Sequence, residues 1–490
     1  MMTEWIWWTA AIVLIVTLVG MTVLTLHFAI ILAIFRQFRR TPPDPAAPFS
    51  GDDPPRVLVQ IPLYNERNVV ERIVRAAAAQ DWPRHRLSIQ VLDDSTDSTP
   101  AIAADLVETL RASGTAIRHI RRAVRTGYKA GALAYGLSLD DAPYVAILDA
   151  DFVPDPDFLR RTVGPLLSDP GLGFVQARWD HQNAGDSLLT EAQSMMLDAA
   201  FAVEQPSRSF AGLVLPFNGT CGVWRREAIR SAGGWSLDVL TEDLDLSIRA
   251  QLRHWRARYL VNVAVPGELP GTLAAWRTQQ FRWTKGFAQV ARKLLPAIWA
   301  SDLSLKAKAA LTLQLGQCLF FPLASAALIS SLTMQLLAGP PSWPFAVLGG
   351  LASTMGLCGM IGFLTSGHAV LHRGGGKRLA KRLPLAFLFG SGLLVSNTRA
   401  ALEGLAGRPS AFIRTPKRGS AAAPPRRYRV RGASGVGELV AAAVLLAIVA
   451  AEQRIFSPLL LPTITGLVTV GLALAREHVA AARDIEPASD

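Results

Sequence analysis

The sequence has few cysteines, and long parts of it carry no charge at all. Its 490 residues include three cysteines, Cys221, Cys318 and Cys358, whose spacing is not that of a metal site. This scarcity excludes a disulfide framework and fits a reduced, cytoplasmic environment. Two stretches, 5–35 and 309–372, contain no Asp, Glu, Lys or Arg. Since a transmembrane helix needs roughly 20 apolar residues, the second stretch is long enough to cross a bilayer twice.

Acidic residues are fewer than basic residues, which gives the chain a formal net charge of +12. The basic residues gather beside the apolar segments, at 36–40, 373–382 and 414–431. Such flanking cations orient membrane spans and contact anionic headgroups, so we expect a lipid bilayer and no nucleic acid as partner. The positive-inside tendency places the amino terminus outside and the chain after the first span in the cytoplasm.

Five membrane crossings are expected, of which the first is an anchor rather than a cleaved signal peptide. Two more, at about 309–338 and 345–370, are separated by the turn GPPSWP, and the last two lie at about 433–451 and 455–475. A shorter apolar run, 383–398, has basic residues on both sides, which favours a re-entrant or surface helix.

Between the first span and residue 309, short runs rich in β-branched residues alternate with helical patterns. This alternation predicts a mostly parallel sheet with helices on both faces, a Rossmann-like α/β domain. In such sheets ligands bind at the carboxyl ends of the strands. The expected strands are 57–65, 87–94, 116–120, 144–151 and 173–179.

Acidic residues close two of these strands. Asp93 and Asp94 end one strand, and Asp149 and Asp151 end another in the sequence LDADF. A D-x-D at a buried strand end offers two hard oxygen ligands, which suit Mg²⁺ or Mn²⁺ carrying a diphosphate. The same pattern also occurs as an ordinary acidic turn, so the neighbouring motifs have to decide between the two interpretations.

Three more residues support a nucleotide site. Tyr64 and Glu66 close the strand in IPLYNE, where a ring and a carboxylate can hold a nucleobase, and Lys129 opens a helix in GYKAGAL, where a phosphate is favoured. Each also has a structural alternative, a core ring for Tyr64 and a solvated charge for Lys129. Together with the acidic strand ends, they favour the binding site.

Two further motifs lie before the second span. In TEDLDL, Thr241 and the acids after it fit a helix cap and first turn, although a cap does not require Thr-Glu-Asp. QQFRWTKG, residues 279–286, belongs to a helical stretch rich in aromatic and basic residues, which predicts an interfacial helix along the membrane surface.

The order of IPLYNE, VLDDSTD, YKAGAL, LDADF, FNGTCGVWRR, TEDLDL and QQFRW resembles the processive family 2 glycosyltransferases with a GT-A fold. The resemblance covers about residues 56–300 and is greatest to the cellulose-synthase-like mannan and glucomannan synthases. It implies a cytoplasmic GT-A catalytic domain and an α-helical transmembrane domain. The implied division is an anchor at 1–40, a catalytic domain at 51–270, the interfacial helix at 271–300, a channel region at 305–475 with a gating-like loop at 403–432, and a cytoplasmic tail at 476–490.

The resemblance also implies roles for individual residues. Asp243 becomes the general base, with Glu242 beside it and Asp94 as a further catalytic residue, and Asp149 and Asp151 hold the metal, Mg²⁺ or Mn²⁺. Asn218, Cys221 and Trp283 contact the acceptor sugar. The donor-binding residues are Tyr64, Glu66, Asp93, Asp94, Lys129, Asp149, Gln279, Gln280, Arg282 and Trp283.

The segment FIRTPK resembles the FxVTxK gating segment of cellulose synthases, with Phe412, Thr415 and Lys417 in the matching positions and Arg414 in place of Val. Lys285 after RWT differs from other branches of the family, which limits any inference about the donor. RYRVR has the arginine spacing of cyclic-dinucleotide receptors, but the partner motif is missing, so we reject that interpretation.

The expected activity is inverting, processive synthesis of a β-linked polysaccharide in the cell inner membrane, with translocation of the product and room for periplasmic or outer-membrane export partners. UDP-glucose and GDP-mannose both stay open as donors, with a slight preference for UDP-glucose from the breadth of the family. The alternatives are a non-processive, ceramide-type lipid glucosyltransferase and a catalytically silent export scaffold. The four aspartates Asp94, Asp149, Asp151 and Asp243 argue against the scaffold.

Overall fold

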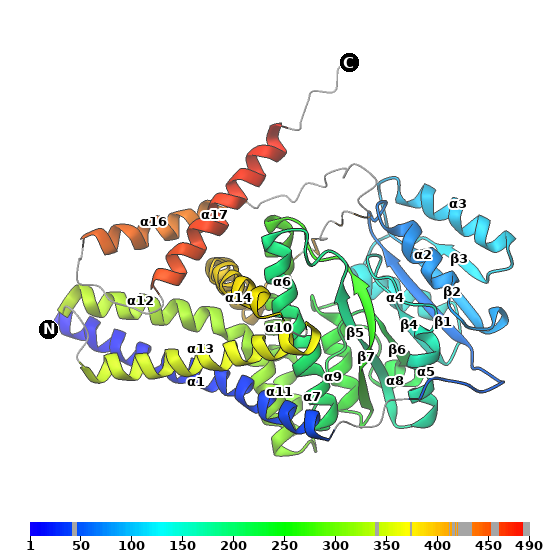
Figure 1. The fold of residues 1–490 in the computed structure, drawn as a ribbon, viewed down its shortest axis with the longest axis horizontal. Helices are drawn as coiled ribbons and strands as arrows, with labels where there is room; N and C mark the ends of the chain where they lie inside the picture. The colour runs from blue at the N-terminus through cyan, green and yellow to red at the C-terminus, as the bar shows by residue number, and fades with distance from the viewer. Residues whose placement is uncertain are drawn as a thin grey trace.

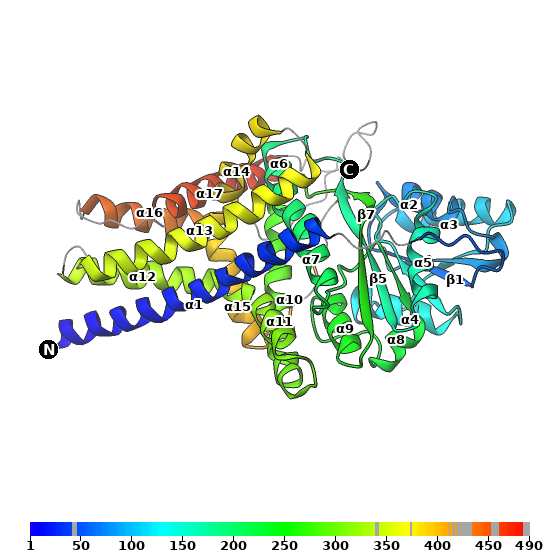
Figure 2. The ribbon, with the colours of Figure 1, turned by 60° about the horizontal axis from the view of Figure 1, so that its bottom comes forward.

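The chain forms an α/β domain joined to a bundle of long apolar helices (Figure 1). The computed structural model describes residues 1–41, 47–338, 343–372, 375–410, 412, 413, 417, 419, 434–451 and 460–483. Turning the molecule shows the long helices α1, α12 and α13 running side by side on the side away from the sheet (Figure 2).

The α/β domain contains one seven-stranded sheet with the order β3-β2-β1-β4-β6-β5-β7. The first four of these strands are parallel, β6 runs antiparallel to β4 and β5, and β7 is parallel to β5. All five strands expected from the sequence are present, and β6 and β7 are additional. The strands are β1 (Val57–Leu63), β2 (Leu87–Asp93), β3 (Ile117–Ile120), β4 (Tyr144–Ile147), β5 (Leu172–His181), β6 (Gly222–Arg225) and β7 (Arg256–Gly267).

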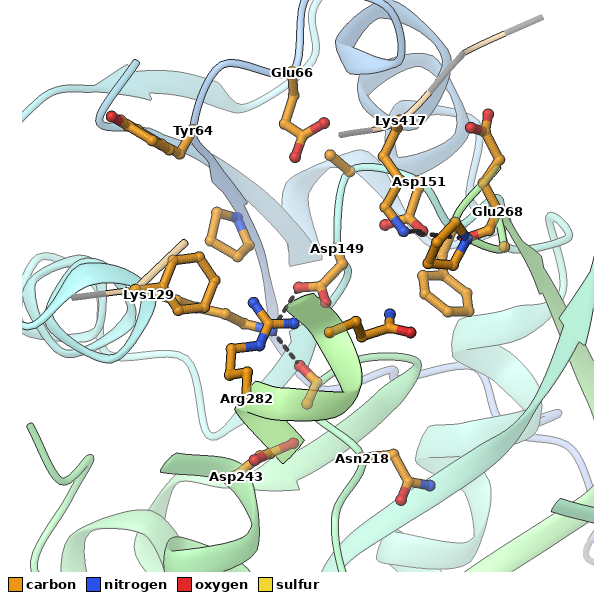
Figure 3. Close-up of a pocket in the computed structure, with 18 of the residues that line it drawn as sticks. Tyr64, Glu66, Lys129, Asp149, Asp151, Asn218, Asp243, Glu268, Arg282 and Lys417 are labelled. Atoms are coloured by element: carbon orange, nitrogen blue, oxygen red, sulfur yellow. Dashed lines mark hydrogen bonds and ion pairs between the residues drawn. The ribbon is translucent and has the colours of Figure 1, made fainter. Parts of the chain in front are cut away.

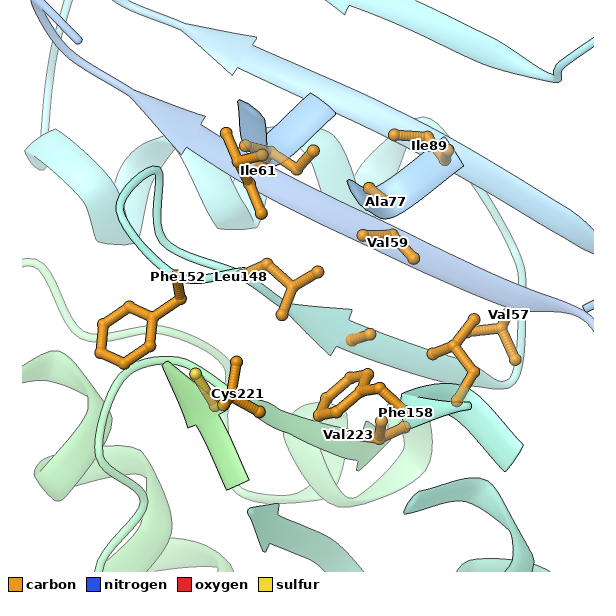
Figure 4. Close-up of a cluster of buried hydrophobic side chains, with 14 of the residues drawn as sticks. Val57, Val59, Ile61, Ala77, Ile89, Leu148, Phe152, Phe158, Cys221 and Val223 are labelled. Atoms are coloured by element: carbon orange, nitrogen blue, oxygen red, sulfur yellow. The ribbon is translucent and has the colours of Figure 1, made fainter. Parts of the chain in front are cut away.

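Helices cover both faces of this sheet because its strands are apolar on both sides. Alternate side chains of β1 enter different layers. Val57, Val59 and Ile61 pack under α2, α3 and α5 (Figure 4). Leu58 packs on the other face with α4, α8 and α9. These helices are α2 (Val70–Ala78), α3 (Thr99–Ala112), α4 (Tyr128–Ser138), α5 (Phe158–Ser168), α8 (Arg226–Ser231) and α9 (Glu242–Gln251).

A second group of short helices joins the domain to the membrane part. It comprises α6 (Leu188–Ala199), a π-helical turn at Ala200–Glu204 and α7 (Gln205–Phe210). Met195, Ala199 and Val203 of this group pack against Ile31 and Phe35 near the end of the first apolar helix. The α/β domain is therefore held against the end of that helix where the basic residues lie.

Within the described residues, four segments are long and apolar enough to cross a membrane: Met2–Arg40, Leu305–Leu337, Gly349–Leu371 and Leu460–Ala480. The sequence predicted five crossings; the count reaches five when a pair of helices bent by 54° is included. At the expected span 433–451, the described helix Val436–Ala451 is shorter than a crossing requires. The helices are α1 (Met2–Arg40), α11 (Leu305–Gly316), α12 (Phe320–Ala338), α13 (Trp343–Leu371), α14 (Gly376–Ser391), α15 (Leu394–Leu405), α16 (Val436–Ala451) and α17 (Leu460–Arg483), with 3-10 turns at Arg84–Arg86 and Gln317–Leu319.

The bent pair is α14 and α15, and it contains the apolar run for which the sequence favoured a re-entrant or surface helix. α15 packs on α10 (Leu273–Ala300), the helix that carries QQFRWTKG. α10 does not simply lie along a surface. Its carboxyl half packs on α9 of the α/β domain, and its amino half packs on α17 and the start of α15. Residues of this helix can therefore reach the sheet and the membrane part at once.

Candidate active site

One pocket opens at the carboxyl ends of β1, β2, β4 and β5, where the topology of the sheet predicts a ligand site. Arg282 of helix α10 and Lys417, which follows α15 in the chain, both line it (Figure 3). Of the predicted site residues, the pocket brings together Tyr64, Glu66, Asp94, Lys129, Asp149, Asp151, Asn218, Glu242, Asp243, Gln279, Arg282, Trp283, Phe412 and Lys417.

Lys129 lies on the floor of the pocket. Its Nζ donates to Asp149 Oδ1 at 2.6 Å and to the carbonyl of Gly219 at 2.9 Å. Burial lowers the pKa of Lys129, but Asp149 and Glu242 outweigh that effect and raise it. The ammonium therefore stays charged at neutral pH, next to the first acid of the D-x-D motif.

Asp151, the second acid of the motif, is paired with another lysine. Lys417 Nζ binds Asp151 Oδ2 at 2.6 Å and the carbonyl of Glu268 at 3.0 Å. Both acids of LDADF are thus ion-paired with a lysine ammonium, so a divalent cation at this motif competes with Lys129 and Lys417 for the carboxylate oxygens. The described residues contain no cluster of three or more His, Cys, Asp or Glu side chains suited to a metal. Two carboxylates fit an ion that takes its remaining ligands from phosphate oxygens and water.

The outer part of the pocket suits a nucleoside. The guanidinium carbon of Arg125 lies 3.3 Å from the centre of the Tyr64 ring and 4.8 Å from that of Tyr128, which makes a stack of flat groups. Asp94 receives hydrogen bonds from two nitrogens of Arg122, Nε at 3.0 Å and Nη2. This fork holds the Asp94 carboxylate at the pocket wall.

Asp243 and Glu242 begin α9 at the bottom of the pocket. Burial and the neighbouring Glu242 raise the pKa of Asp243 to about 7, and burial raises the pKa of Glu242. Gly219, with φ of +81°, makes room for this carboxylate, because a Cβ there would stand 2.8 Å from Asp243 Oδ2. A carboxylate with a pKa near the working pH can accept a proton efficiently.

Helix α10 presents Gln279, Arg282 and Trp283 to the pocket, as their helical spacing predicts. Burial lowers the pKa of Arg282, whereas Glu242, Asp149 and Asp243 oppose that shift. The helix approaches α9 closely at Gly286, where a Cβ would lie 2.4 Å from Thr241 Cγ2. QQFRWTKG is thus packed directly on the TED motif.

Three predicted residues are not brought into the pocket. Asp93 is 1% exposed and accepts hydrogen bonds from Ser95 N at 2.8 Å and His119 Nε2 at 2.9 Å. Burial opposes its ionisation, but these hydrogen bonds lower its pKa. Cys221 is fully buried in the hydrophobic core, and Gln280 is not among the residues that line the pocket. Thr415 lies outside the described residues.

Several pocket residues are missing from the sequence prediction. Trp179, Asp180 and His181 close β5, and Glu268 closes β7. Asp94 and Asp149 were selected by the rule that ligands bind at the carboxyl ends of the strands, here called the strand-end rule. The same rule would have selected Trp179, Asp180 and His181, because β5 was predicted to end there. Arg125 carries no such signal, since its contact with Tyr64 arises from tertiary packing.

A mixed α/β sheet with a D-x-D at a strand end, a buried acid of raised pKa and an arginine opposite is typical of transferases that use nucleotide-diphosphate sugars. Residues 54–286 match the family described as "Glycosyltransferase like family 2". Residues 54–286 therefore form a domain of the family 2 glycosyltransferase type, beside several long apolar helices, which confirms the resemblance and the fold class predicted from the sequence.

Similar curated proteins include plant glucomannan 4-beta-mannosyltransferases. The chain is 46% identical over 274 residues to the probable glucomannan 4-beta-mannosyltransferase 9 of Oryza sativa subsp. japonica, covering 53% of this chain and 52% of that protein. It is 47% identical over 249 residues to glucomannan 4-beta-mannosyltransferase 2 of Arabidopsis thaliana, covering 50% and 46%. The chain thus spans about half the length of the curated relatives it matches.

Among solved structures, a mannosyltransferase from Pyrobaculum calidifontis in complex with GDP-Man and Mn²⁺ has a TM-score of 0.56 and 24% sequence identity. The match covers 81% of this chain and 100% of that one. At this identity the likeness supports the GT-A fold.

Proposed function

We propose that the protein is an inverting, processive mannosyltransferase that builds a β-1,4-linked mannan or glucomannan from GDP-mannose on the cytoplasmic side of a membrane. The observation that carries the proposal is the shared pocket: Asp149, Asp243 and Arg282 line one cavity, and the helix that bears Arg282 also packs on the membrane helices. Passage of the polymer through the membrane part, and an inner membrane as its location, belong to the same proposal.

The names of the relatives favour GDP-mannose over UDP-glucose, the donor to which the sequence alone inclined. Both plant proteins are glucomannan 4-beta-mannosyltransferases, and the archaeal enzyme was solved with GDP-Man and Mn²⁺. The glucomannan in these names leaves UDP-glucose as a second donor for the same pocket. Both nucleotide sugars are therefore offered to the protein in the experiment that tests the proposal.

In the proposed donor complex, the nucleobase lies near Tyr64 and Arg125, and the diphosphate lies between Asp149 and Arg282. Asp149 and Asp151 would hold a divalent cation, which supplies charge neutralisation of the leaving diphosphate. Arg282 can bind phosphate oxygens with two parallel hydrogen bonds, and Lys129 adds a second positive charge nearby. These residues orient the donor so that its anomeric carbon faces Asp243.

The transfer step is a single displacement. An acceptor hydroxyl oxygen attacks the anomeric carbon, the bond from that carbon to the phosphate oxygen breaks, and its electron pair leaves on the GDP. The hydroxyl proton passes to the Asp243 carboxylate, whose pKa of about 7 suits a general base at neutral pH. Because the nucleophile enters opposite the leaving group, an α-linked donor gives a β-linked product.

Trp283 and Asn218 line the same pocket and can hold the terminal sugar of the acceptor, the indole by stacking and the amide by hydrogen bonding. After each transfer the new terminal sugar has to move away from Asp243. The neighbouring membrane helices provide a direction for this movement.

The proposal is tested with membranes or purified protein incubated with labelled GDP-mannose, UDP-glucose or both, plus Mg²⁺ or Mn²⁺. We expect a long polymer from GDP-mannose that an endo-β-1,4-mannanase degrades. A lipid glycosyltransferase would give products of one or a few sugars in the organic phase, and a scaffold would give none. Either result, or transfer from UDP-glucose alone, contradicts the proposal.

A further inference from the structure

Lys285, the residue of QQFRWTKG at which the sequence departs from other branches of the family, is fully buried. It does not line the pocket. Burying an ammonium group is costly unless it is paired and hydrogen-bonded. Lys285 Nζ donates to Glu403 Oε2 of α15 at 2.8 Å and also to Ser410 Oγ. The lysine therefore joins α10 to the chain that follows α15.

Ser410 stands two residues before Phe412, which reaches the pocket. The Arg282 guanidinium lies 4.5 Å from the centre of the Phe412 ring, and the Tyr128 ring centre lies 5.8 Å from it. Further on, Lys417 binds Asp151, as described above. Phe412 thus contacts the side of α10 that carries Arg282, and Lys417 contacts the D-x-D motif.

Arg282 and Lys285 are three residues apart on α10, so they lie on neighbouring turns of one rigid helix. The Lys285 to Ser410 hydrogen bond consequently fixes where Phe412 meets Arg282. The Glu403 carboxylate compensates the buried charge and leaves one oxygen for Arg399, which binds Glu403 Oε1 at 2.7 Å from the solvent side. Arg399 is 75% exposed, whereas Lys285 is completely enclosed.

We infer that Lys285 is a positioning residue: with Glu403 as counter-ion, it anchors Ser410 and thereby sets Phe412 against Arg282. The inference concerns the pocket of the proposed mannosyltransferase and rests on that function for its kinetic consequence. The anchoring itself is independent of the identity of the donor.

Other contacts hold α10 on the membrane part without involving Ser410. Glu477 of α17 accepts hydrogen bonds from Leu273 N at 2.8 Å and Ala274 N at 2.9 Å, and Glu438 of α16 pairs with Arg277 at 2.8 Å. Loss of the Lys285 anchor should therefore leave α10 docked. A change in the chain after Ser410 can therefore be measured in a protein whose α10 packing is unchanged.

Three variants test the inference. Ser410→Ala removes the anchor and keeps every charge, so the protein should fold as the wild type does. The double variant Lys285→Met/Glu403→Leu replaces the ion pair with apolar side chains, a change that is often neutral or stabilising for a buried pair. Arg399→Ala is the matched control, because it removes the exposed partner of the same carboxylate, and exposed pairs contribute little.

Two readouts are measured on the full-length protein: hydrogen exchange of a peptide that contains Phe412 and Gly419, and kcat for mannosyl transfer. The melting temperature of each variant is measured as a control for folding. Loss of a hydrogen bond to a charged group changes an equilibrium constant by roughly tenfold or more, here the equilibrium between the anchored and the released chain after Ser410. We expect Ser410→Ala and the double variant to exchange faster and to lower kcat by roughly tenfold, with a melting temperature near that of the wild type. Arg399→Ala should change neither readout.

The inference is overturned if both Ser410→Ala and the double variant exchange at the wild-type rate. It is also overturned if kcat falls only in those variants whose melting temperature falls with it. If the wild type transfers no mannose from GDP-mannose, the proposed function fails, and the exchange measurement still decides whether Lys285 anchors Ser410.

Discussion

Replacing Asp243 by asparagine tests catalysis and stability together. The folded protein raises the pKa of this carboxyl group from 3.8 to about 7. It therefore binds the proton more tightly than the unfolded chain does. The resulting stabilisation is fully present below pH 3.8 and is lost as the pH rises through about 7. From these two pKa values, the free energy of unfolding falls relative to its low-pH value by about 2 kcal/mol at pH 5, where only the unfolded chain is ionised, and by about 4 kcal/mol at pH 8, where both states are ionised.

Asparagine has nearly the same shape and cannot ionise. We expect Asp243→Asn to lose transfer activity by roughly a thousandfold, within the usual contribution of a general base, and to keep its affinity for GDP-mannose. The variant should melt at a higher temperature than the wild type at pH 8, with a smaller difference at pH 5. For the wild type, kcat/KM should rise about tenfold per pH unit below pH 7 and level off above it.

The assays are donor binding, transfer rates from pH 5.5 to 9, and thermal melting of the detergent-solubilised protein. Asp238→Asn is the control, since Asp238 is 66% exposed and lies five residues before Asp243. Transfer by Asp243→Asn above a tenth of the wild-type rate, or a wild-type pH profile that is flat across pH 7, would refute the reasoning.

Further outcomes follow from the packing of the site. Gly286→Ala should reduce transfer by more than tenfold while GDP binding persists, because the new Cβ would stand 2.4 Å from Thr241 Cγ2 and shift α10; unchanged kinetics would contradict this. Arg282→Lys should lower kcat/KM roughly a hundredfold, because lysine cannot form the bidentate contact with the diphosphate. Cys221→Ser should lower the melting temperature, because it places a hydroxyl in the core at a cost of about 1–3 kcal/mol. The KM for the acceptor should not change; a changed KM would support the predicted contact between Cys221 and the acceptor sugar. EDTA should abolish transfer, and added Mn²⁺ should restore it.

The strand-end rule explains how much of the site could be predicted from the sequence. The carboxyl ends of β1, β2 and β4 share one edge, so Tyr64, Asp94 and Asp149 could be assigned to one place before the fold was known. The rule cannot distinguish adjacent residues. Asp93 and Asp94 are neighbours, and side chains alternate along a strand, so only Asp94 reaches the pocket while Asp93 is buried beside His119.

Other parts of the site depend on contacts between distant segments. Cys221 stands in the same loop as Asn218, but it begins the pairing with β4 and so turns into the core. β7 begins with two arginines, which hid its alternating pattern, and Glu268 was missed with it. The link from Lys285 to Ser410 joins residues 125 positions apart, which no local pattern could reveal.

The most direct test of the account is an experimental structure of the protein in a lipid nanodisc with GDP-mannose and Mn²⁺. We expect the diphosphate between the carboxylates of Asp149 and Asp151 and the guanidinium of Arg282, with the anomeric carbon turned toward Asp243 and Trp283 at the membrane side. A nucleotide bound outside this cavity, or an anomeric carbon turned away from Asp243, would contradict it.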